Sequence, residues 1–461
     1  MAKGRSAGQL IGPLGLGVLA LASLACAADS ARVVLPTLDG SMPLIIGHRG
    51  LPGLYPEETQ PSYEAAAAAG ADSLEEDLHL TKDCVLVARH NPWLSDNTNI
   101  TAVALTNAAV AARRRTVPGV WVNVTYSLAG YGGPAQYLSD LTNPADPKSV
   151  LKSLVVDGED HTNDWSITDF TVAELKRWIG GTTFDAADER PNALNGKYPI
   201  LTMQEIIDLA KSTSAATGRT ITVYTETKNP YWNNAQAIAN GCGSGKHPFE
   251  DALIKLLTIN KMTSRTAPIF VQSFDPASLK YLRSAGLNTR MVQLIDGNEV
   301  DYATGETIYR SDNASNFVDG RPYSWTVAGD GRFFGAMLTT AGLAEIKTYA
   351  DGIGPWKPQV MSMKVSPLKT ANANGTTPYL PKLADVNSVT PTGLIAAAHQ
   401  AGLFVHPYTF RNESKYLAGL FGGAPTLEFL SYFRAGVDGV FTDFANTGVA
   451  ARSIYLVETG R

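Results

Sequence analysis

Short apolar runs alternate with amphipathic stretches over most of the chain. The apolar runs are typical of parallel strands covered on both faces, and they lie at 43–47, 72–80, 85–90, 220–226, 269–274, 290–295, 360–365, 403–408 and 439–442. Stretches with helical spacing lie at 61–70, 171–179, 202–212, 249–259, 276–285, 343–350, 391–401 and 426–435. Repeated alternation of strand and helix predicts an α/β fold with a parallel sheet. About eight strand candidates in one chain favour a closed TIM (β/α)8 barrel over an open doubly wound sheet.

The regular pattern loosens between about residues 94 and 195. Turn signals such as Gly132-Gly133 and Asn143-Pro144 interrupt this stretch. It is too long for a plain barrel loop and too hydrophobic for a linker. We therefore predict one barrel domain over 28–461, with a sizeable insertion between early barrel elements.

The first 27 residues are typical of a signal peptide. Lys3 and Arg5 give a positive start, an apolar run covers 10–24, and small residues suit cleavage before Ala28. A buried helix or a membrane anchor is the alternative. No later stretch is long and apolar enough to span a bilayer. We expect an exported protein, periplasmic or secreted, with no transmembrane anchor after signal removal.

The composition argues against nucleic acid as a partner of this protein. The chain has 461 residues, of which 44% are hydrophobic, and a formal net charge of -5. It can bury a large core, and it lacks the basic stretches that nucleic-acid binding requires. Cys84 and Cys242 are the two cysteines left after signal removal. A disulfide and two unpaired thiols both fit an exported protein.

Acidic side chains mark the ends of two predicted strands. Glu75 and Asp77 are two residues apart on one strand, so they point to the same side, and Glu76 points away. Glu226 ends a later strand. Carboxylates gathered in a barrel mouth repel one another, and oxygen-only ligands suit Ca²⁺, Mg²⁺ or Mn²⁺. A solvated strand end is the alternative for each piece taken alone.

Two histidines and two cations follow strands in the same way. His48 and Arg49 come directly after the first apolar strand, His90 ends the third, and Lys228 shares a face with Glu226. Imidazoles can exchange protons near neutral pH, and a guanidinium fits phosphate. Phosphodiester cleavage requires a base, an acid and positive charge on the phosphate. A structural His-Arg pair and a surface Glu-Lys pair are the alternatives.

Several motifs together resemble one family. Gly47-His48-Arg49-Gly50, Pro56-Glu57-Glu58-Thr59, Leu74-Glu75-Glu76-Asp77-Leu78 and Thr81-Lys82-Asp83 resemble the opening of glycerophosphodiester phosphodiesterases. Later blocks also match, namely Glu226-Thr227-Lys228, Gln272-Ser273-Phe274-Asp275, His406-Pro407-Tyr408-Thr409 and Phe441-Thr442-Asp443. The resemblance extends from about Leu44 to Phe444.

This resemblance implies an enzyme on a TIM barrel that hydrolyses glycerophosphodiesters, such as glycerophosphocholine or glycerophosphoethanolamine, to glycerol 3-phosphate and an alcohol. It implies one divalent cation, with Ca²⁺ favoured over Mg²⁺. The implied roles are metal binding by Glu75, Asp77 and Glu226, catalysis by His48, His90 and Arg49, and substrate binding by Arg49, Lys228 and Tyr408.

The chain departs from the family pattern at Glu58, where Asn is usual, and at Asn91, where Asp is usual. These departures bear on substrate choice and rate more than on reaction class.

Two other functions fit the sequence. A lysophospholipase D or sphingomyelinase D-like enzyme would need an apolar groove. Trp93, Trp356 and Tyr408 are candidates to line it, and stacking on a headgroup or plain packing are the alternatives for these three residues. A catalytically silent cell-surface binding protein is the other.

Overall fold

Eight parallel strands form the centre of the protein. The computed structural model describes residues 34–117, 119–123, 142–143, 146–184, 190–243, 245–309, 320–367 and 380–461. The strands run in the order β17-β14-β11-β10-β9-β2-β1-β18. They are β1 (Leu44–Gly47), β2 (Ser73–Leu80), β9 (Thr222–Thr227), β10 (Ile269–Ser273), β11 (Arg290–Ile295), β14 (Gly352–Pro355), β17 (Phe404–Val405) and β18 (Gly439–Thr442).

Backbone hydrogen bonds bring the two edges of this sheet together. The N–H groups of Asp438 and Phe441 donate to the carbonyls of Val405 and Pro407, at 2.9 and 3.0 Å, and Phe410 N–H donates to Phe441 O at 2.8 Å. A parallel sheet joined at its edges has its strand carboxyl ends on one rim. The predicted TIM-like barrel is confirmed.

Two predicted strands lie outside the barrel. β3 (Leu86–Ala88) pairs antiparallel with β2. β15 (Met361–Lys364) pairs antiparallel with β16 (Ser388–Pro391) in a separate hairpin. The prediction that both belong to the parallel series was wrong, and β14 is the barrel strand that it missed. Half of β14 is glycine, and a Cβ at Gly352 would meet the Phe404 ring at 2.2 Å.

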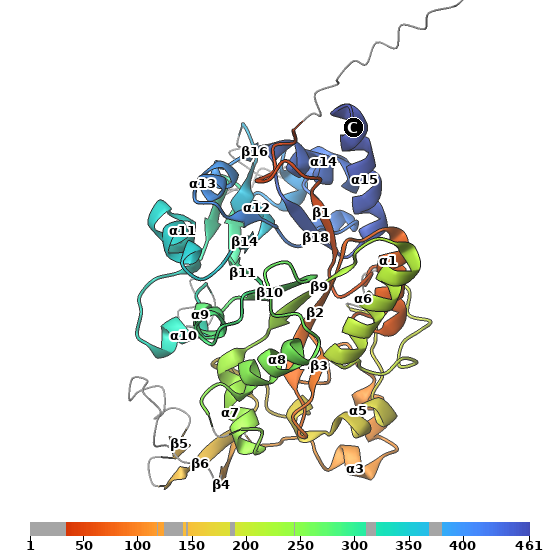
Figure 1. Cartoon of the computed structure of the whole chain (residues 1–461), viewed down its shortest axis with the longest axis vertical. Helices are drawn as coiled ribbons and strands as arrows, with labels where there is room; N and C mark the ends of the chain where they lie inside the picture. The colour runs from red at the N-terminus through yellow and green to blue at the C-terminus, as the bar shows by residue number, and fades with distance from the viewer. Residues whose placement is uncertain are drawn as a thin grey trace, which may run out of the picture. The chain divides into compact units, whose positions relative to one another are not determined.

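Helices cover the outside of the barrel. In Figure 1, α1, α6 and α15 lie along one side of the strands, and α11 and α13 lie along the other. α6 begins with the expected capping box of Thr202 and Glu205. The main covering helices are α1 (Gln60–Ala69), α6 (Met203–Thr217), α7 (Pro230–Ala239), α8 (Pro248–Ile259), α9 (Pro276–Ser284), α11 (Thr340–Lys347), α13 (Leu394–Gln400), α14 (Pro425–Ala435) and α15 (Ala445–Glu458).

The predicted insertion lies between β3 and β9. It has its own core, in which Leu94, Ile100, Trp165, Phe170 and Leu175 are buried together. Its described elements are α2 (Ile100–Ala104), α3 (Ala108–Ala111), β4 (Gly119–Asn123), β5 (Thr142–Asn143), β6 (Asp146–Ser153), β7 (Val155–Val156), β8 (Glu159–Asp160), η1 (Ile167–Asp169) and α5 (Val172–Trp178). The predicted signal peptide lies outside the described residues.

Shorter helices and strands lie in the segments that connect the later barrel strands, from β11 onward. They are the hairpin of β12 (Glu299–Asp301) and β13 (Glu306–Ile308), then α10 (Tyr323–Val327), η2 (Phe334–Leu338), α12 (Lys357–Val360), η3 (Leu383–Asp385), η4 (Ser414–Tyr416) and η5 (Gly419–Phe421). Cys84 and Cys242 form a disulfide with a Cα–Cα distance of 5.3 Å, which answers the question left open by the sequence.

Aromatic side chains fill the interior of the barrel below its polar rim. Ile46, Tyr224, Phe270, Val292 and Phe441 form one buried cluster, and the Tyr224 and Phe270 rings stack at 4.6 Å. This packed layer closes the barrel from below, so ligands reach the rim from one side only.

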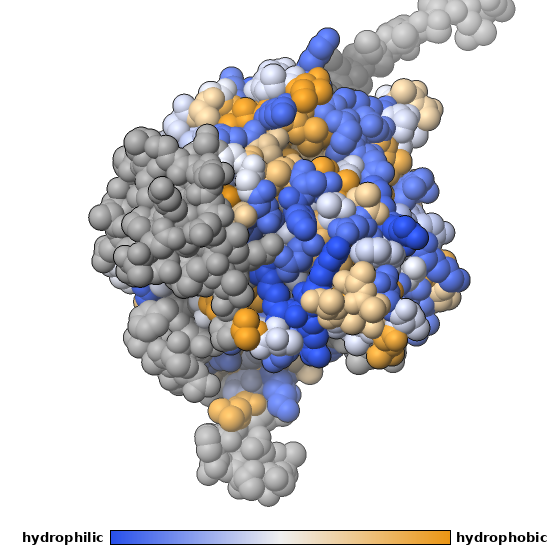
Figure 2. All heavy atoms as spheres, turned by 90° about the horizontal axis from the view of Figure 1, so that it is seen from below, coloured by the Kyte–Doolittle hydropathy of each residue, from blue (hydrophilic) through white to orange (hydrophobic). Residues whose placement is uncertain are grey.

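The described residues seen in Figure 2 form a mainly polar surface, with hydrophobic residues scattered among the polar ones. Across the described residues, every helix is too short or too polar to cross a bilayer.

Candidate active site

Three carboxylates meet at the rim. Asp77 on β2 pairs in register with Glu226 on β9. Glu75 lies two residues before Asp77, on the same face of β2. Each of the three offers an oxygen within 4.8 Å of the others. All three are buried, with exposed fractions of 1, 1 and 5% for Glu75, Asp77 and Glu226. The alternation of β2 therefore brings its two acids together as predicted.

Cations and amides hold this triad. Arg49 Nε lies 3.0 Å from Asp77 Oδ2, and Lys228 Nζ lies 3.4 Å from Glu226 Oε1. Gln272, next to Glu226 in register on β10, donates from Nε2 to Glu75 Oε1 at 3.0 Å. The backbone N–H of Arg49 donates to Glu75 Oε2 at 2.8 Å. These contacts fix the carboxylates but leave the site acidic.

The pKa values reflect this balance. Burial raises the pKa of Glu226 to about 8, against the opposing effect of Lys228. Burial and the nearby Asp77 raise the pKa of Glu75 well above its usual value. Burial also acts upward on the pKa of Asp77, but Lys228 and Arg49 hold it below its usual value. Two of the three carboxyls resist ionisation, and the triad offers only oxygen donors, so it fits a divalent cation such as Ca²⁺ or Mg²⁺.

Two further buried acids, Glu57 and Glu58, contact Arg49 and Asp77. Glu57 accepts from Arg49 Nη1 at 3.0 Å, and Glu58 Oε1 accepts from the Asp77 N–H at 2.8 Å. Both acids are 2% exposed. Arg49 and Glu58 have positive φ angles of 53° and 56°. Non-glycine residues keep such angles only where their surroundings enforce them. The surrounding contacts therefore fix this turn, in which the Arg49 side chain reaches Asp77.

His48 is oriented by a carboxylate that the sequence did not single out. His48 Nδ1 lies 2.6 Å from Asp443 Oδ1 at the end of β18. Burial and Arg49 lower the pKa of His48, while Asp443 acts in the opposite direction. Asp443 Oδ2 is in turn held by Arg190 and Arg411 at 2.7 and 2.9 Å. The Nε2 side of the ring is thereby left for the cavity.

His90 lines the same cavity, although not from a barrel strand as expected. It follows β3, and its carbonyl lies 3.3 Å from Nε2 of the buried His79. Asn91, at the position where the family usually has Asp, donates to Asp96 Oδ2 at 3.0 Å. Burial and Arg49 lower the pKa of His90 well below its usual value.

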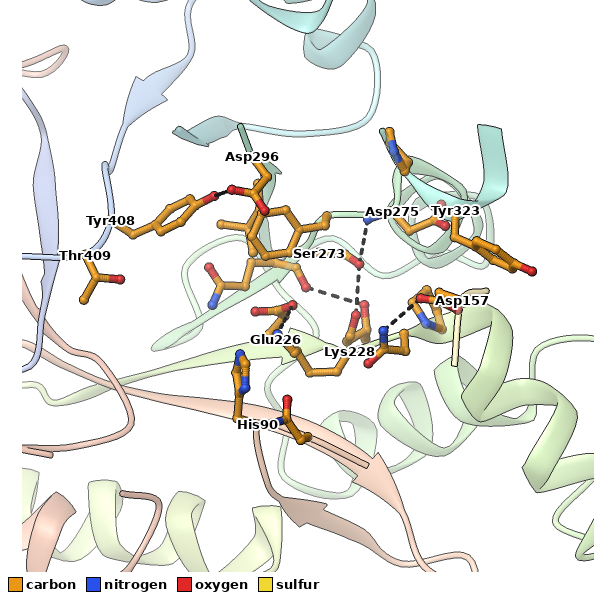
Figure 3. Close-up of a pocket in the computed structure, with 18 of the residues that line it drawn as sticks. His90, Asp157, Glu226, Lys228, Ser273, Asp275, Asp296, Tyr323, Tyr408 and Thr409 are labelled. Carbon is orange, nitrogen blue, oxygen red and sulfur yellow. Dashed lines mark hydrogen bonds and ion pairs between the residues drawn. The ribbon is translucent and has the colours of Figure 1, made fainter. Parts of the chain in front are cut away.

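One cavity of about 560 Å³ joins these groups. Its lining includes seven of the eight predicted site residues, namely His48, Arg49, Glu75, His90, Glu226, Lys228 and Tyr408. Asp77 is not part of the lining and contacts Arg49 behind it. In Figure 3, Glu226, Lys228 and His90 lie between two side walls. One wall carries Tyr408 and Asp296, and the other carries Asp157, Asp275 and Tyr323.

Several site residues were missed from the sequence. Arg190, Arg411 and Asp443 act on His48, and Asp157 lines the cavity from the turn between β7 and β8. Asp443 and Gln272 belong to motifs that carry the family resemblance, but no role was predicted for them from the sequence. Arg190 and Asp157 lie in the insertion, outside any recognisable motif.

Comparison with known proteins decides the family. The model of the glycerophosphoryl diester phosphodiesterase family matches residues 48–328 and 348–447, which is most of the chain. The chain belongs to this family. The resemblance drawn from the motifs is confirmed, and so are the enzyme class and its reaction, hydrolysis of glycerophosphodiesters.

Relatives of the phosphodiesterase cover nearly all of its length. Glycerophosphodiester phosphodiesterase GDPD6 of Arabidopsis thaliana is 28% identical over 91% of this chain and 88% of its own. Glycerophosphodiester phosphodiesterase of Haemophilus influenzae is 24% identical over 95% and 97%. A solved phosphodiesterase of Oleispira antarctica, in complex with the product sn-glycerol-3-phosphate, has a TM-score of 0.45 and 14% identity over 89% and 97%.

Proposed function

We propose that this phosphodiesterase acts on small, water-soluble glycerophosphodiesters and releases glycerol 3-phosphate and an alcohol. The observation that carries the proposal is the meeting of three buried carboxylates, two cationic side chains and two imidazoles around one cavity. Each of these groups has a task in phosphodiester hydrolysis.

Glu75, Asp77 and Glu226 would hold one divalent cation, for which we favour Ca²⁺ and keep Mg²⁺ as the second choice. When bound, such a cation polarises the phosphoryl oxygens and stabilises the charge that develops on them. Both ions prefer oxygen donors, and the triad supplies only oxygens.

Arg49 and Lys228 would bind the phosphate beside the triad. Arg49 uses Nε and Nη1 for Asp77 and Glu57, which leaves its Nη2 amine for a phosphate oxygen. Lys228 lies within 4.0 Å of both Glu226 and Asp77 and lines the cavity. Two fixed cations hold the diester in one orientation before the reaction begins.

His90 and His48 would divide the proton transfers. Among the described residues, the His90 ring forms no hydrogen bond or ion pair with a carboxylate, and its pKa lies well below its usual value. Its neutral ring is therefore suited to accept the proton of the nucleophile, which is either water or a glycerol hydroxyl. His48 is backed by Asp443. A carboxylate behind the ring stabilises the imidazolium form, so we assign to His48 the proton that goes to the leaving oxygen.

A lipid substrate is the competing proposal. Of the three aromatic residues named for its groove, Trp93 and Tyr408 line the cavity and Trp356 does not. The Tyr408 hydroxyl donates to Asp296 at 2.9 Å, and Asp157 and Asp275 line the opposite wall. Carboxylates are costly to bury against an acyl chain, so walls that carry Asp157, Asp275 and Asp296 suit a polar alcohol better.

The decisive experiment compares glycerophosphocholine with lysophosphatidylcholine, each with Ca²⁺, Mg²⁺ or chelator. We expect release of glycerol 3-phosphate from the first substrate, its loss with chelator, and its restoration by cation. His48→Ala and Glu75→Ala should abolish turnover while circular dichroism shows an intact fold. Near-normal turnover in either variant, or faster cleavage of the lysolipid, would contradict the proposal.

We also propose that the protein is exported, on the basis of its N-terminal sequence. The Cys84–Cys242 disulfide supports this, because such bonds persist in oxidising compartments. The test is N-terminal sequencing of protein from the periplasm or medium of a host that carries the whole chain. A mature protein that starts at Ala28 is expected, and an uncleaved cytoplasmic product would contradict export.

A further inference from the structure

The carboxylate behind His48 has no spare oxygen. Asp443 Oδ1 faces His48 Nδ1 at 2.6 Å, while Oδ2 receives Arg190 Nη2 at 2.7 Å and Arg411 Nε at 2.9 Å. The Asp443 side chain is 2% exposed. Three directed contacts on two oxygens prevent the carboxylate from rotating, so it presents the same oxygen to the imidazole at all times.

We propose that Arg190 is a positioning residue for His48 and acts through Asp443, so that the insertion completes the active site. This inference rests on the proposed role of His48 in proton transfer. Arg190 belongs to the insertion between β3 and β9, whereas His48 and Asp443 end the barrel strands β1 and β18.

The burial of Arg190 supports a fixed role. Its side chain is only 2% exposed, and its Nε donates to Glu413 at 2.6 Å. Its guanidinium also lies 5.6 Å from the Phe444 ring. A guanidinium with two charge-assisted bonds in a shielded place has one orientation. Arg411 is more exposed, at 19%, and so is less constrained.

The charges in this group balance. Arg190 and Arg411 face Asp443 and Glu413, two cations against two anions. Burial raises the free energy of an unpaired charge steeply. Removal of one of these four side chains would therefore leave a buried charge unbalanced. The balanced group keeps Asp443 an acceptor, which places the proton of neutral His48 on Nδ1 and turns Nε2 toward the substrate.

The consequence is specific to catalysis. Without Arg190, Asp443 keeps one cation and regains freedom to rotate, so the population of correctly oriented His48 falls. Substrate is held by other groups, Arg49 and Lys228, which do not contact Arg190. Loss of Arg190 should therefore lower kcat and leave KM nearly unchanged.

The test is a double-mutant cycle on the whole chain with its cation, assayed on glycerophosphocholine. Arg190→Gln should lower kcat roughly ten- to hundredfold with KM within about twofold. In the Asp443→Asn background the same change should cost less than about threefold, because residues that act as one unit are not additive. Arg190→Lys should recover part of the rate.

Two further variants guard against misfolding. Arg190→Gln combined with Glu413→Gln removes one cation and one anion together and should fold, with the same loss of kcat. Arg115→Gln is the matched control, since Arg115 is also in the insertion and pairs with Asp169 at 2.7 Å. It should leave kcat unchanged.

The outcomes separate this inference from the proposed function. Additive losses in the cycle, a loss confined to KM, or unchanged kcat in Arg190→Gln would overturn the positioning role while the enzyme still hydrolyses glycerophosphocholine. Absence of hydrolysis by the unmodified chain would instead overturn the proposed substrate.

Discussion

Binding of a cation to the triad should release protons near neutral pH. The pKa of Glu226 is raised to about 8, and that of Glu75 is also raised. A carboxyl with a pKa of 8 is about 90% protonated at pH 7. Because a cation binds only the carboxylate form, we expect about 0.9 proton released per Ca²⁺ from Glu226 alone, and more with Glu75.

The same linkage sets the pH dependence of affinity. Protons compete with the cation below the raised pKa values, so affinity should increase from pH 6 to pH 8 and level off above. The expected slope is about tenfold per pH unit for one proton and approaches a hundredfold for two.

Calorimetry at pH 7 in buffers of different ionisation enthalpy measures this release directly. Glu226→Gln should reduce the release by about 0.9 proton and weaken binding most at pH 8. Glu159→Gln is the control, because Glu159 lines the cavity outside the triad and its side chain is 43% exposed. Less than about 0.2 proton released, with affinity flat from pH 6 to 8, would refute the reasoning.

Three stability predictions concern other features. Removing the Cys84–Cys242 disulfide by a double Ser substitution should cost about 5 kcal/mol in urea unfolding, because it opens a loop with a sequence separation of 158; a cost under about 1 kcal/mol would contradict this. Phe270→Ala should cost about 3–5 kcal/mol, since the ring is buried between Tyr224 and Arg290, whereas a Phe270→Leu control should lose much less. Burial and Asp275 raise the pKa of Asp157 to about 7, so its folded form resists ionisation and stability falls as pH rises from about 4 to 7. Asp157→Asn should therefore have a higher Tm than the unmodified protein at pH 8 and the same Tm at pH 4, and an equal difference at both pH values would argue against it.

Strand alternation and the common rim of parallel strands were enough to predict that the three carboxylates meet. Side chains two residues apart on a strand share a face regardless of the rest of the fold, so Glu75 and Asp77 could be paired from sequence. The position of Glu226 followed because the carboxyl ends of parallel strands share one rim. These are local rules that tertiary packing does not alter.

Packing decided what the sequence did not reveal. β14 holds only one large apolar side chain, Ile353, while Gly352 leaves room for the Phe404 ring and Gly354 leaves room for Leu294, so it carries no strand-like pattern. The run at 360–365 has that pattern but pairs in a hairpin. Arg190 is an isolated arginine whose partner Asp443 lies 253 positions away, and no spacing rule reaches across that distance.

The pairing of β1 with β18 has a consequence for synthesis of the chain. His48 is separated from Asp443 by 395 positions. A ribosome has therefore made almost the whole polypeptide before the imidazole can meet its carboxylate. Nascent or C-terminally truncated forms that lack β18 would carry the three carboxylates and both histidines, but not the carboxylate that contacts His48. If His48 and Asp443 act as proposed, a chain that lacks β18 should not hydrolyse glycerophosphodiesters.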